Sequence, residues 1–135
     1  MIEERRIRIL VVDDHDVVRG ILCRLLQAEP DFVIQEAANG ADGLTRASEL
    51  QPNVILLDIN LPDADGLSLA KELKTVAPAA EIVLVSDYNE GEIEKAFSGG
   101  VRGYLLKSDS ATELVTAVRT VFKKEQYLSK KLRRQ

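Results

Sequence analysis

Short apolar runs alternate along the chain with longer stretches whose apolar residues recur every three or four positions. The short, β-branched runs predict buried strands at residues 7–12, 32–38, 54–57, 81–85 and 103–106. The longer period predicts helices at residues 16–29, 41–50, 67–77 and 90–97. The first helix places six residues on one apolar face: Val17, Val18, Ile21, Leu22, Leu25 and Leu26. A fifth helix is predicted to begin with Ser110-Ala-Thr-Glu113, which has the pattern of a capping box, and to continue to Phe122.

This alternation of strands and helices determines the expected fold class. Parallel strands need a crossover connection, so strict alternation with short links predicts a parallel sheet covered by helices on both faces. We therefore predict an α/β, flavodoxin-like doubly wound fold, in which a five-stranded parallel sheet in the order 2-1-3-4-5 is packed against five helices. A chain of 135 residues suits one such domain.

The net charge of −4 hides an uneven distribution of charge along the chain. Residues 123–135 contain six Lys/Arg and one Glu, so the other 122 residues carry a net charge of −9. An acidic body of this kind repels nucleic acid, which is a polyanion. We therefore interpret the basic segment as a solvated helix end or the beginning of a linker rather than as a DNA contact.

The remaining composition excludes several classes of protein and site. No apolar run approaches the ~20 residues of a membrane span, and no signal-peptide pattern follows Met1, so we expect a cytoplasmic protein without membrane contact. The single cysteine, Cys23, excludes an internal disulfide and is expected to contribute only to packing. The single histidine, His15, excludes a multi-histidine metal site and is expected at the rim of the domain.

Polar residues stand at the carboxyl ends of four predicted strands. Asp13-Asp14 follow the first strand, Asp58 the third, Ser86 the fourth and Lys107 the fifth. In an open α/β sheet, ligands bind at the carboxyl ends of the strands. We therefore predict one pocket that contains three carboxylates, a hydroxyl and an ammonium group.

The three carboxylates of this pocket predict a metal site. They offer oxygen ligands without sulfur or an imidazole cluster, which suits Mg²⁺ or Mn²⁺. Each pair of carboxylates at ~4 Å costs about 4 kcal/mol at an effective dielectric constant of ~20. A divalent cation and Lys107 together would neutralise Asp13, Asp14 and Asp58. The backbone carbonyl of Asn60, two residues beyond Asp58, is a further candidate ligand.

Asp58 is the predicted nucleophile, because it stands alone at the end of the most apolar and therefore central strand. A carboxylate that attacks phosphorus forms an aspartyl phosphate. This replaces one negative charge with about two and leaves the neutral pocket with one unbalanced charge. Ser86 and Lys107 are expected to move toward the phosphoryl oxygens, which would shift two strand ends.

The motifs VVDDH, LLDINLPDADG, VLVS and GYLLK resemble, in their order and spacing, the receiver domain of bacterial two-component response regulators. The resemblance covers about residues 7–123. It implies a receiver domain at residues 1–123, with residues 124–135 as the start of a linker or a C-terminal helix extension. It also implies a phosphohistidine on a sensor histidine kinase as the donor, and no enzymatic activity beyond the chain's own phosphorylation and dephosphorylation.

The same resemblance implies a role for each residue of the pocket. The phosphoacceptor is implied to be Asp58. The Mg²⁺ ligands are implied to be Asp14, Asp58 and the carbonyl of Asn60, with Asp13 holding a metal-bound water. The phosphoryl contacts are implied to be Ser86 and Lys107. Tyr104 matches the switch aromatic of the family, which turns inward on activation.

Two longer segments, VVDDHDVVRGIL and GGVRGYLLKSDSATEL, resemble regulators that carry a LuxR-type helix-turn-helix output domain. That output domain lies outside this sequence, so DNA binding is expected only through it. A homodimer is a further expected assembly. Two interpretations stay open. The favoured one is a receiver excised from a longer transcription regulator, and the other is a stand-alone receiver that acts by protein contact.

Two residues depart from the family pattern. Asp87 follows Ser86 where a small residue is usual, and its charge would either repel an incoming phosphoryl group or position hydrolytic water. Ser108 follows Lys107 where proline is usual, so the usual cis Lys-Pro bond cannot form. Asp87 keeps open the alternative of a degenerate receiver that is regulated without phosphorylation.

Two other functions fit the sequence less well. A haloacid-dehalogenase-type phosphohydrolase needs a second acid two residues after its nucleophile, where this chain has Asn60. A flavodoxin-like cofactor carrier needs a Ser/Thr/Gly-rich phosphate loop after the first strand, where this chain has the acidic DDHD. Taken singly, Asp13 and Ser86 would be helix caps and Tyr104 a half-buried aromatic residue, but the complete set favours the pocket.

Overall fold

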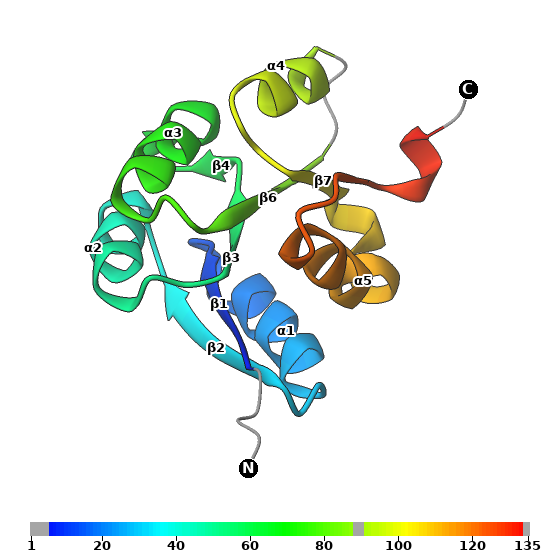
Figure 1. Cartoon of the computed structure of the whole chain (residues 1–135), viewed down its shortest axis with the longest axis horizontal. Helices are drawn as coiled ribbons and strands as arrows, with labels where there is room; N and C mark the ends of the chain where they lie inside the picture. Colours follow the sequence, from blue (N-terminus) through cyan, green and yellow to red (C-terminus); the bar gives the residue numbers. More distant parts are fainter. Residues whose placement is uncertain (1–5, 88–90, 134–135) are drawn as a thin grey trace.

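The structure contains one parallel sheet flanked by helices. The computed structural model describes residues 6–87 and 91–133, and these contain a six-stranded sheet and five α-helices (Figure 1). The strands of this sheet are β1 (Ile7–Val12), β2 (Phe32–Ala37), β3 (Val54–Asp58), β6 (Glu81–Ser86), β7 (Gly103–Leu106) and β8 (Tyr127–Leu128). The helices are α1 (Asp16–Gln27), α2 (Gly40–Leu50), α3 (Gly66–Val76), α4 (Glu92–Ser98) and α5 (Ser110–Phe122).

The strands follow the predicted order. The sheet reads β2-β1-β3-β6-β7-β8, and all neighbouring strands are parallel. Its first five positions are the predicted order 2-1-3-4-5, so the doubly wound fold class is confirmed. The predicted start of the fourth helix at Glu90 lies outside the described residues. A separate antiparallel pair, β4 (Asn60–Leu61) and β5 (Ala64–Asp65), follows β3.

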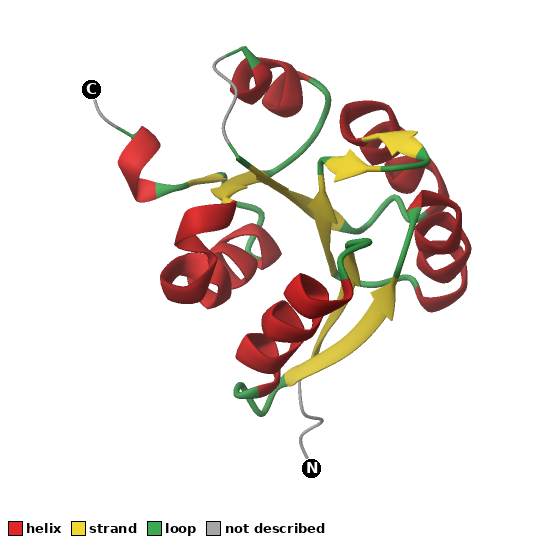
Figure 2. Cartoon of the chain, turned by 180° about the vertical axis from the view of Figure 1, so that it is seen from behind, coloured by secondary structure: helices red, strands yellow, loops and turns green. Residues whose placement is uncertain are grey.

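Alternate side chains of the central strands enter two hydrophobic cores, one on each face of the sheet. Leu10 and Val12 belong to the core that includes residues of α2 and α3. Ile9 and Val11 belong to the core that includes residues of α1 and α5. Figure 2 shows the sheet between these two sets of helices. Burial on both faces explains why the strands are continuous apolar runs rather than alternations of polar and apolar residues.

The apolar face of α1 is wider than the sheet can cover. Leu22 and Leu26 are buried, but Val17, Val18 and Ile21, which the sequence pattern places on the same face, are exposed.

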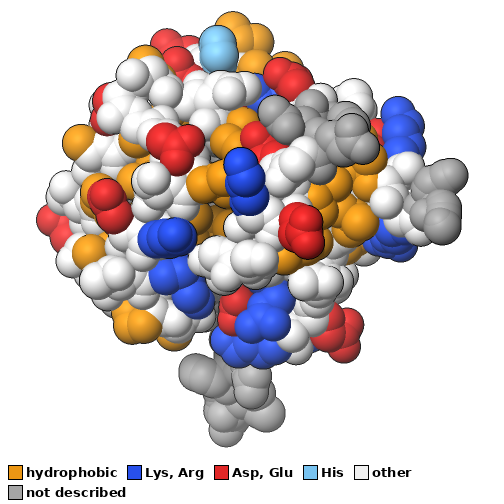
Figure 3. All heavy atoms as spheres, turned by 90° about the horizontal axis from the view of Figure 1, so that it is seen from above, with side chains coloured by type: hydrophobic (Ala, Val, Ile, Leu, Met, Phe, Trp, Pro, Cys, Tyr) orange, Lys and Arg blue, Asp and Glu red, His pale blue; other side chains and the backbone are white. Residues whose placement is uncertain are grey.

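One face of the molecule, drawn in Figure 3, shows acidic and basic side chains close to one another with hydrophobic side chains between them. Within residues 6–87 and 91–133, no helix has the length and apolar character to span a membrane.

The sixth strand, β8, is absent from the sequence prediction, which places residues 124–135 outside the sheet. β8 pairs with the first half of β7. Ser129, directly after β8, is fully buried, and its Oγ accepts a hydrogen bond from the Leu106 N–H at 2.8 Å. Its own N–H donates to the Tyr104 carbonyl at 3.0 Å. The C-terminal segment is therefore attached along the strand that leads to Lys107.

The predicted capping box at the start of α5 does not form. A 3₁₀ turn, η1 (Lys107–Asp109), leads directly into the helix, so Ser110 has helical backbone angles (φ −58°, ψ −41°) and cannot cap it. The Glu113 carboxylate instead accepts hydrogen bonds from the Tyr127 hydroxyl and from the Lys130 N–H (3.1 Å). This buried side chain therefore fastens the C-terminal segment, including the second 3₁₀ turn η2 (Lys130–Leu132), to α5.

We expect Glu113→Ala to lower the free energy of unfolding by about 3 kcal/mol, because it leaves the buried Tyr127 hydroxyl and the Lys130 N–H without an acceptor. Urea unfolding followed by circular dichroism measures the change. Glu125→Ala removes the same charge at an exposed position and should change the free energy by less than about 0.5 kcal/mol. Equal losses in the two variants would contradict the role assigned to Glu113.

Candidate functional site

The carboxyl ends of four neighbouring strands bring the predicted site residues to one edge of the sheet. Asp58 and Ser86 are the last residues of β3 and β6, Asp13 follows β1, and Lys107 follows β7. These strands are consecutive in the sheet and parallel to one another. Their parallel direction therefore places three kinds of functional group, carboxylate, hydroxyl and ammonium, at the same edge.

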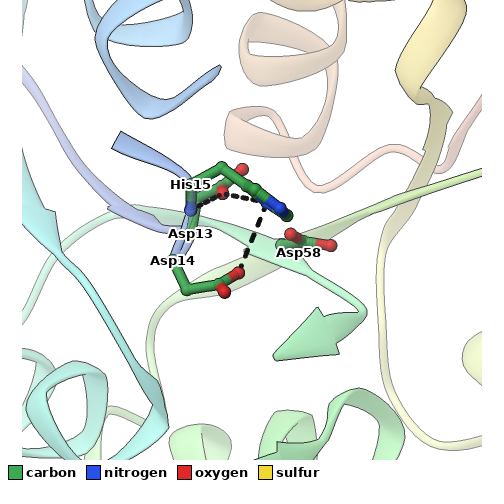
Figure 4. A group of neighbouring side chains, drawn as sticks. All are labelled: Asp13, Asp14, His15 and Asp58. Carbon is green, nitrogen blue, oxygen red and sulfur yellow. Dashed lines mark hydrogen bonds and ion pairs between the residues drawn. The ribbon is translucent and has the colours of Figure 1, made fainter. Parts of the chain in front are cut away.

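Three carboxylates crowd together in this site. Asp13, Asp14, His15 and Asp58 each offer one ligand atom, and these four atoms lie within 4.8 Å of one another (Figure 4). Burial raises the pKa of Asp13 above its ordinary value, although a hydrogen bond from the His15 N–H (2.9 Å) opposes the shift. The side chain of His15 is 62% exposed, with Nδ1 3.5 Å from Asp14 Oδ1. His15 therefore lies at the rim, while Asp13 and Asp58 form the buried part.

Two oxygens of the acidic cluster are buried without a hydrogen-bond donor among the described residues, Oδ1 of Asp14 and Oδ2 of Asp58. Such oxygens lose their solvation by water without gaining a hydrogen bond, which costs free energy. A divalent cation would satisfy both, and ligands that are all oxygen suit hard cations. The cluster therefore fits a hard divalent metal ion.

Asp58 is held in place by two donors to one of its oxygens. Lys107 Nζ lies 3.2 Å from Asp58 Oδ1, and the Asn60 N–H donates to the same oxygen at 2.9 Å. The peptide bond before Ser108 is trans, as are the other peptide bonds of the described chain, yet Lys107 reaches Asp58. These two contacts orient the Asp58 carboxylate and leave Oδ2 as its unpaired oxygen.

The hydroxyls of Ser86 and Tyr104 meet at a residue that the sequence analysis missed. Both donate to Glu92 Oε1, each at 2.7 Å. Ser86 is 3% exposed and Tyr104 is fully buried, so Tyr104 already points inward in this structure. Glu92 is the first residue of α4 and belongs to no recognisable motif, so only the fold brings it to Ser86. Asp87, the residue after Ser86, is exposed.

The loop after Asp58 is fixed by sterics and by hydrogen bonds to the next helix. A Cβ atom on Gly66 would lie 2.7 Å from the Ile59 Cα, so the loop requires glycine there because of close packing. The sequence analysis assigned no role to Asp63, whose carboxylate accepts hydrogen bonds from the N–H groups of Gly40 (2.8 Å) and Ala41 (3.1 Å). These hydrogen bonds lower the pKa of Asp63 and connect the loop to the start of α2.

Arg19 of α1 contacts the backbone of the acidic cluster, a role that the sequence analysis also missed. Its guanidinium donates to the Asp13 carbonyl at 2.7 Å and pairs with Glu36 at 2.9 Å and Asp16 at 2.9 Å. The hydrogen bond to Glu36 raises the pKa of Arg19 above its ordinary value. The backbone that carries Asp13 is therefore anchored to a permanent cation.

Most of the chain matches the sequence signature of a known family, described as the response regulator receiver domain, over residues 9–119. The chain belongs to this family. Response regulator protein VraR of Staphylococcus epidermidis is 38% identical over 121 residues, which are 88% of this chain and 58% of that protein. This receiver domain thus spans less than two thirds of the length of that relative.

Solved structures agree with the family assignment. A LuxR-family two-component response regulator from an Aurantimonas species superimposes with a TM-score of 0.88 at 28% identity, over 94% of this chain and 92% of that chain. A Burkholderia pseudomallei response regulator, solved with a phosphorylated aspartic acid, a calcium ion and citrate, gives a TM-score of 0.77 at 27% identity, over 87% and 69%. The resemblance to LuxR-type receivers is confirmed.

Proposed function

We propose that this receiver accepts a phosphoryl group on Asp58 and relays its phosphorylation state to an output. The observation that carries the proposal is the buried Asp58 carboxylate, which is oriented through Oδ1 by Lys107 and the Asn60 N–H while Oδ2 has no donor. In the reaction, an Asp58 carboxylate oxygen forms a bond to phosphorus. The P–N bond of a phosphohistidine breaks, and the leaving imidazole nitrogen keeps the electron pair.

The acidic cluster is proposed to hold Mg²⁺, with Mn²⁺ as an alternative. Asp14, Asp58 and the carbonyl of Asn60 would be its ligands, and Asp13 would hold a metal-bound water. This arrangement is supported by the buried oxygens of Asp14 and Asp58 that have no hydrogen-bond donor among the described residues. When bound, the cation would balance the negative charge that gathers on the phosphoryl oxygens.

Ser86 and Lys107 are proposed to contact the phosphoryl group. Phosphorylation leaves about one more negative charge in the pocket, which attracts the Lys107 ammonium and the Ser86 hydroxyl. Ser86 and Tyr104 share one acceptor, so a movement of Ser86 changes the environment of Tyr104. Tyr104 lies in β7, beside β8 and the C-terminal segment, which gives the change a route to the end of the domain.

The partners are proposed from the family. The similarity to VraR and to LuxR-family regulators supports a sensor histidine kinase as the donor and a LuxR-type DNA-binding output domain as the effector. The receiver is proposed to comprise residues 1–123, and residues 124–135, which add β8 to its sheet, are proposed to lead toward that output domain. Homodimer formation and a cytoplasmic location are further expectations of this assignment. Catalysis is proposed to be limited to the chain's own phosphorylation and dephosphorylation.

The proposed function predicts Mg²⁺-dependent phosphorylation by a small donor. With acetyl phosphate, the P–O bond to the acetyl group breaks and acetate leaves with the electron pair. Intact-mass spectrometry should show one added phosphoryl group with Mg²⁺ and none when EDTA is present, because the repulsion among the three carboxylates is then uncompensated. Equal phosphorylation with Mg²⁺ and with EDTA would contradict the proposed metal site.

A further inference from the structure

One carboxylate at the start of α4 accepts hydrogen bonds from both hydroxyls of the proposed switch, those of Ser86 and Tyr104. Glu92 Oε1 accepts from Ser86 Oγ and from the Tyr104 hydroxyl, each at 2.7 Å. An ionised carboxylate can only accept hydrogen bonds, so both hydroxyl protons point toward Glu92. Both donor residues are buried, and a hydrogen bond to an ionised group is strong where water is excluded.

The hydroxyl of Ser86 has one proton and can donate it to one strong acceptor at a time. While the proton points toward Glu92, it is not donated to a phosphoryl oxygen on Asp58. We propose that Glu92 is a positioning residue that competes with the phosphoryl group of Asp58 for the Ser86 hydroxyl. This inference rests on the proposed phosphorylation of Asp58.

The competition has a structural consequence for α4. When Ser86 turns toward a phosphoryl group, Glu92 loses the donor Ser86 and keeps the donor Tyr104. α4 has only seven residues, of which only Ala96 is buried, so few contacts oppose a displacement of this helix. Glu92 therefore connects the occupancy of Asp58 to the position of α4 through its contact with Ser86.

Beryllofluoride, which binds aspartate as an analogue of the phosphoryl group, tests the competition in the whole chain. Isothermal titration calorimetry with Mg²⁺ present measures its dissociation constant. Because the competing hydrogen bond from Ser86 to a charged acceptor is removed, Glu92→Ala should tighten binding about tenfold. Glu92→Gln keeps an acceptor oxygen without the charge and should tighten binding less. Glu94→Ala removes the same charge at an exposed position of α4 and should change the constant by less than about twofold.

A double-mutant cycle separates competition for the hydroxyl from other effects of Glu92. In a Ser86→Ala background, Glu92→Ala should no longer tighten binding, because the contested proton is absent. The same tightening in both backgrounds, or no tightening in the wild-type background, would overturn the inference. A wild-type chain that binds no beryllofluoride would instead contradict the proposed function itself, and the inference with it.

Discussion

Asp58→Asn abolishes phosphoprotein formation from acetyl phosphate. The amide nitrogen cannot replace a carboxylate oxygen as the nucleophile, so no acyl phosphate forms at this position. The buried pocket stays largely intact, because the asparagine oxygen can still accept from Lys107 and from the Asn60 N–H. Intact-mass spectrometry after incubation with donor and Mg²⁺ should show only the unmodified chain.

A matched substitution in the same loop controls for charge. Asp65→Asn also removes one carboxylate, but Asp65 is exposed and its side chain caps α3 by accepting from the Ser68 N–H at 3.1 Å. Asparagine caps helices as well as aspartate does, so the fold should be unaffected. Asp65→Asn is therefore expected to be phosphorylated normally. A phosphorylated Asp58→Asn variant would show that another residue is the acceptor.

Lys107→Ala should slow phosphorylation of Asp58 by about 100-fold. The Lys107 ammonium is proposed to stabilise the negative charge that develops on the phosphoryl oxygens, and the loss of one such preorganised group lowers a rate by about this factor. The substitution should also lower the free energy of unfolding by about 3 kcal/mol in the absence of Mg²⁺, because it leaves the buried Asp58 carboxylate without its cation. The initial rate of phosphoprotein formation and urea unfolding measure the two effects.

Lys123→Ala is the control for Lys107→Ala. Lys123 is exposed beyond the end of α5, so its removal should change neither the rate nor the stability appreciably. Addition of Mg²⁺ should restore part of the stability lost in Lys107→Ala, because a second cation then balances Asp58. A Lys107→Ala variant with wild-type rate would remove Lys107 from the proposed mechanism.

The residues that sequence reasoning found share one property, which is their place at the end of a strand. Asp58 and Ser86 follow apolar runs directly, and parallel strands in this fold class align their carboxyl ends. The site could therefore be assembled from local patterns and one topological rule. The order of the first five strands followed from the same alternation.

The contacts that sequence reasoning missed depend on the finished tertiary structure. β8 has two residues within a basic segment, too short for a period-two pattern to appear. Glu113 stands in a capping-box sequence, but its carboxylate accepts a hydrogen bond from Tyr127 of the C-terminal segment instead. The preceding 3₁₀ turn gives Ser110 helical backbone angles, so Ser110 cannot act as the cap. Glu92 follows no strand and reaches Ser86 only because the tertiary structure brings the first residue of α4 to side chains of β6 and β7.

The most direct measurement of the central claim is the position of the acyl phosphate. Borohydride reduces an acyl phosphate to an alcohol, so a phosphorylated aspartate becomes homoserine, which peptide mass spectrometry can locate. The chain, treated with acetyl phosphate and Mg²⁺ and then reduced, should contain homoserine at position 58 and at no other aspartate. Homoserine at Asp13, Asp14 or Asp87, or an unmodified Asp58 in a phosphorylated chain, would contradict the account.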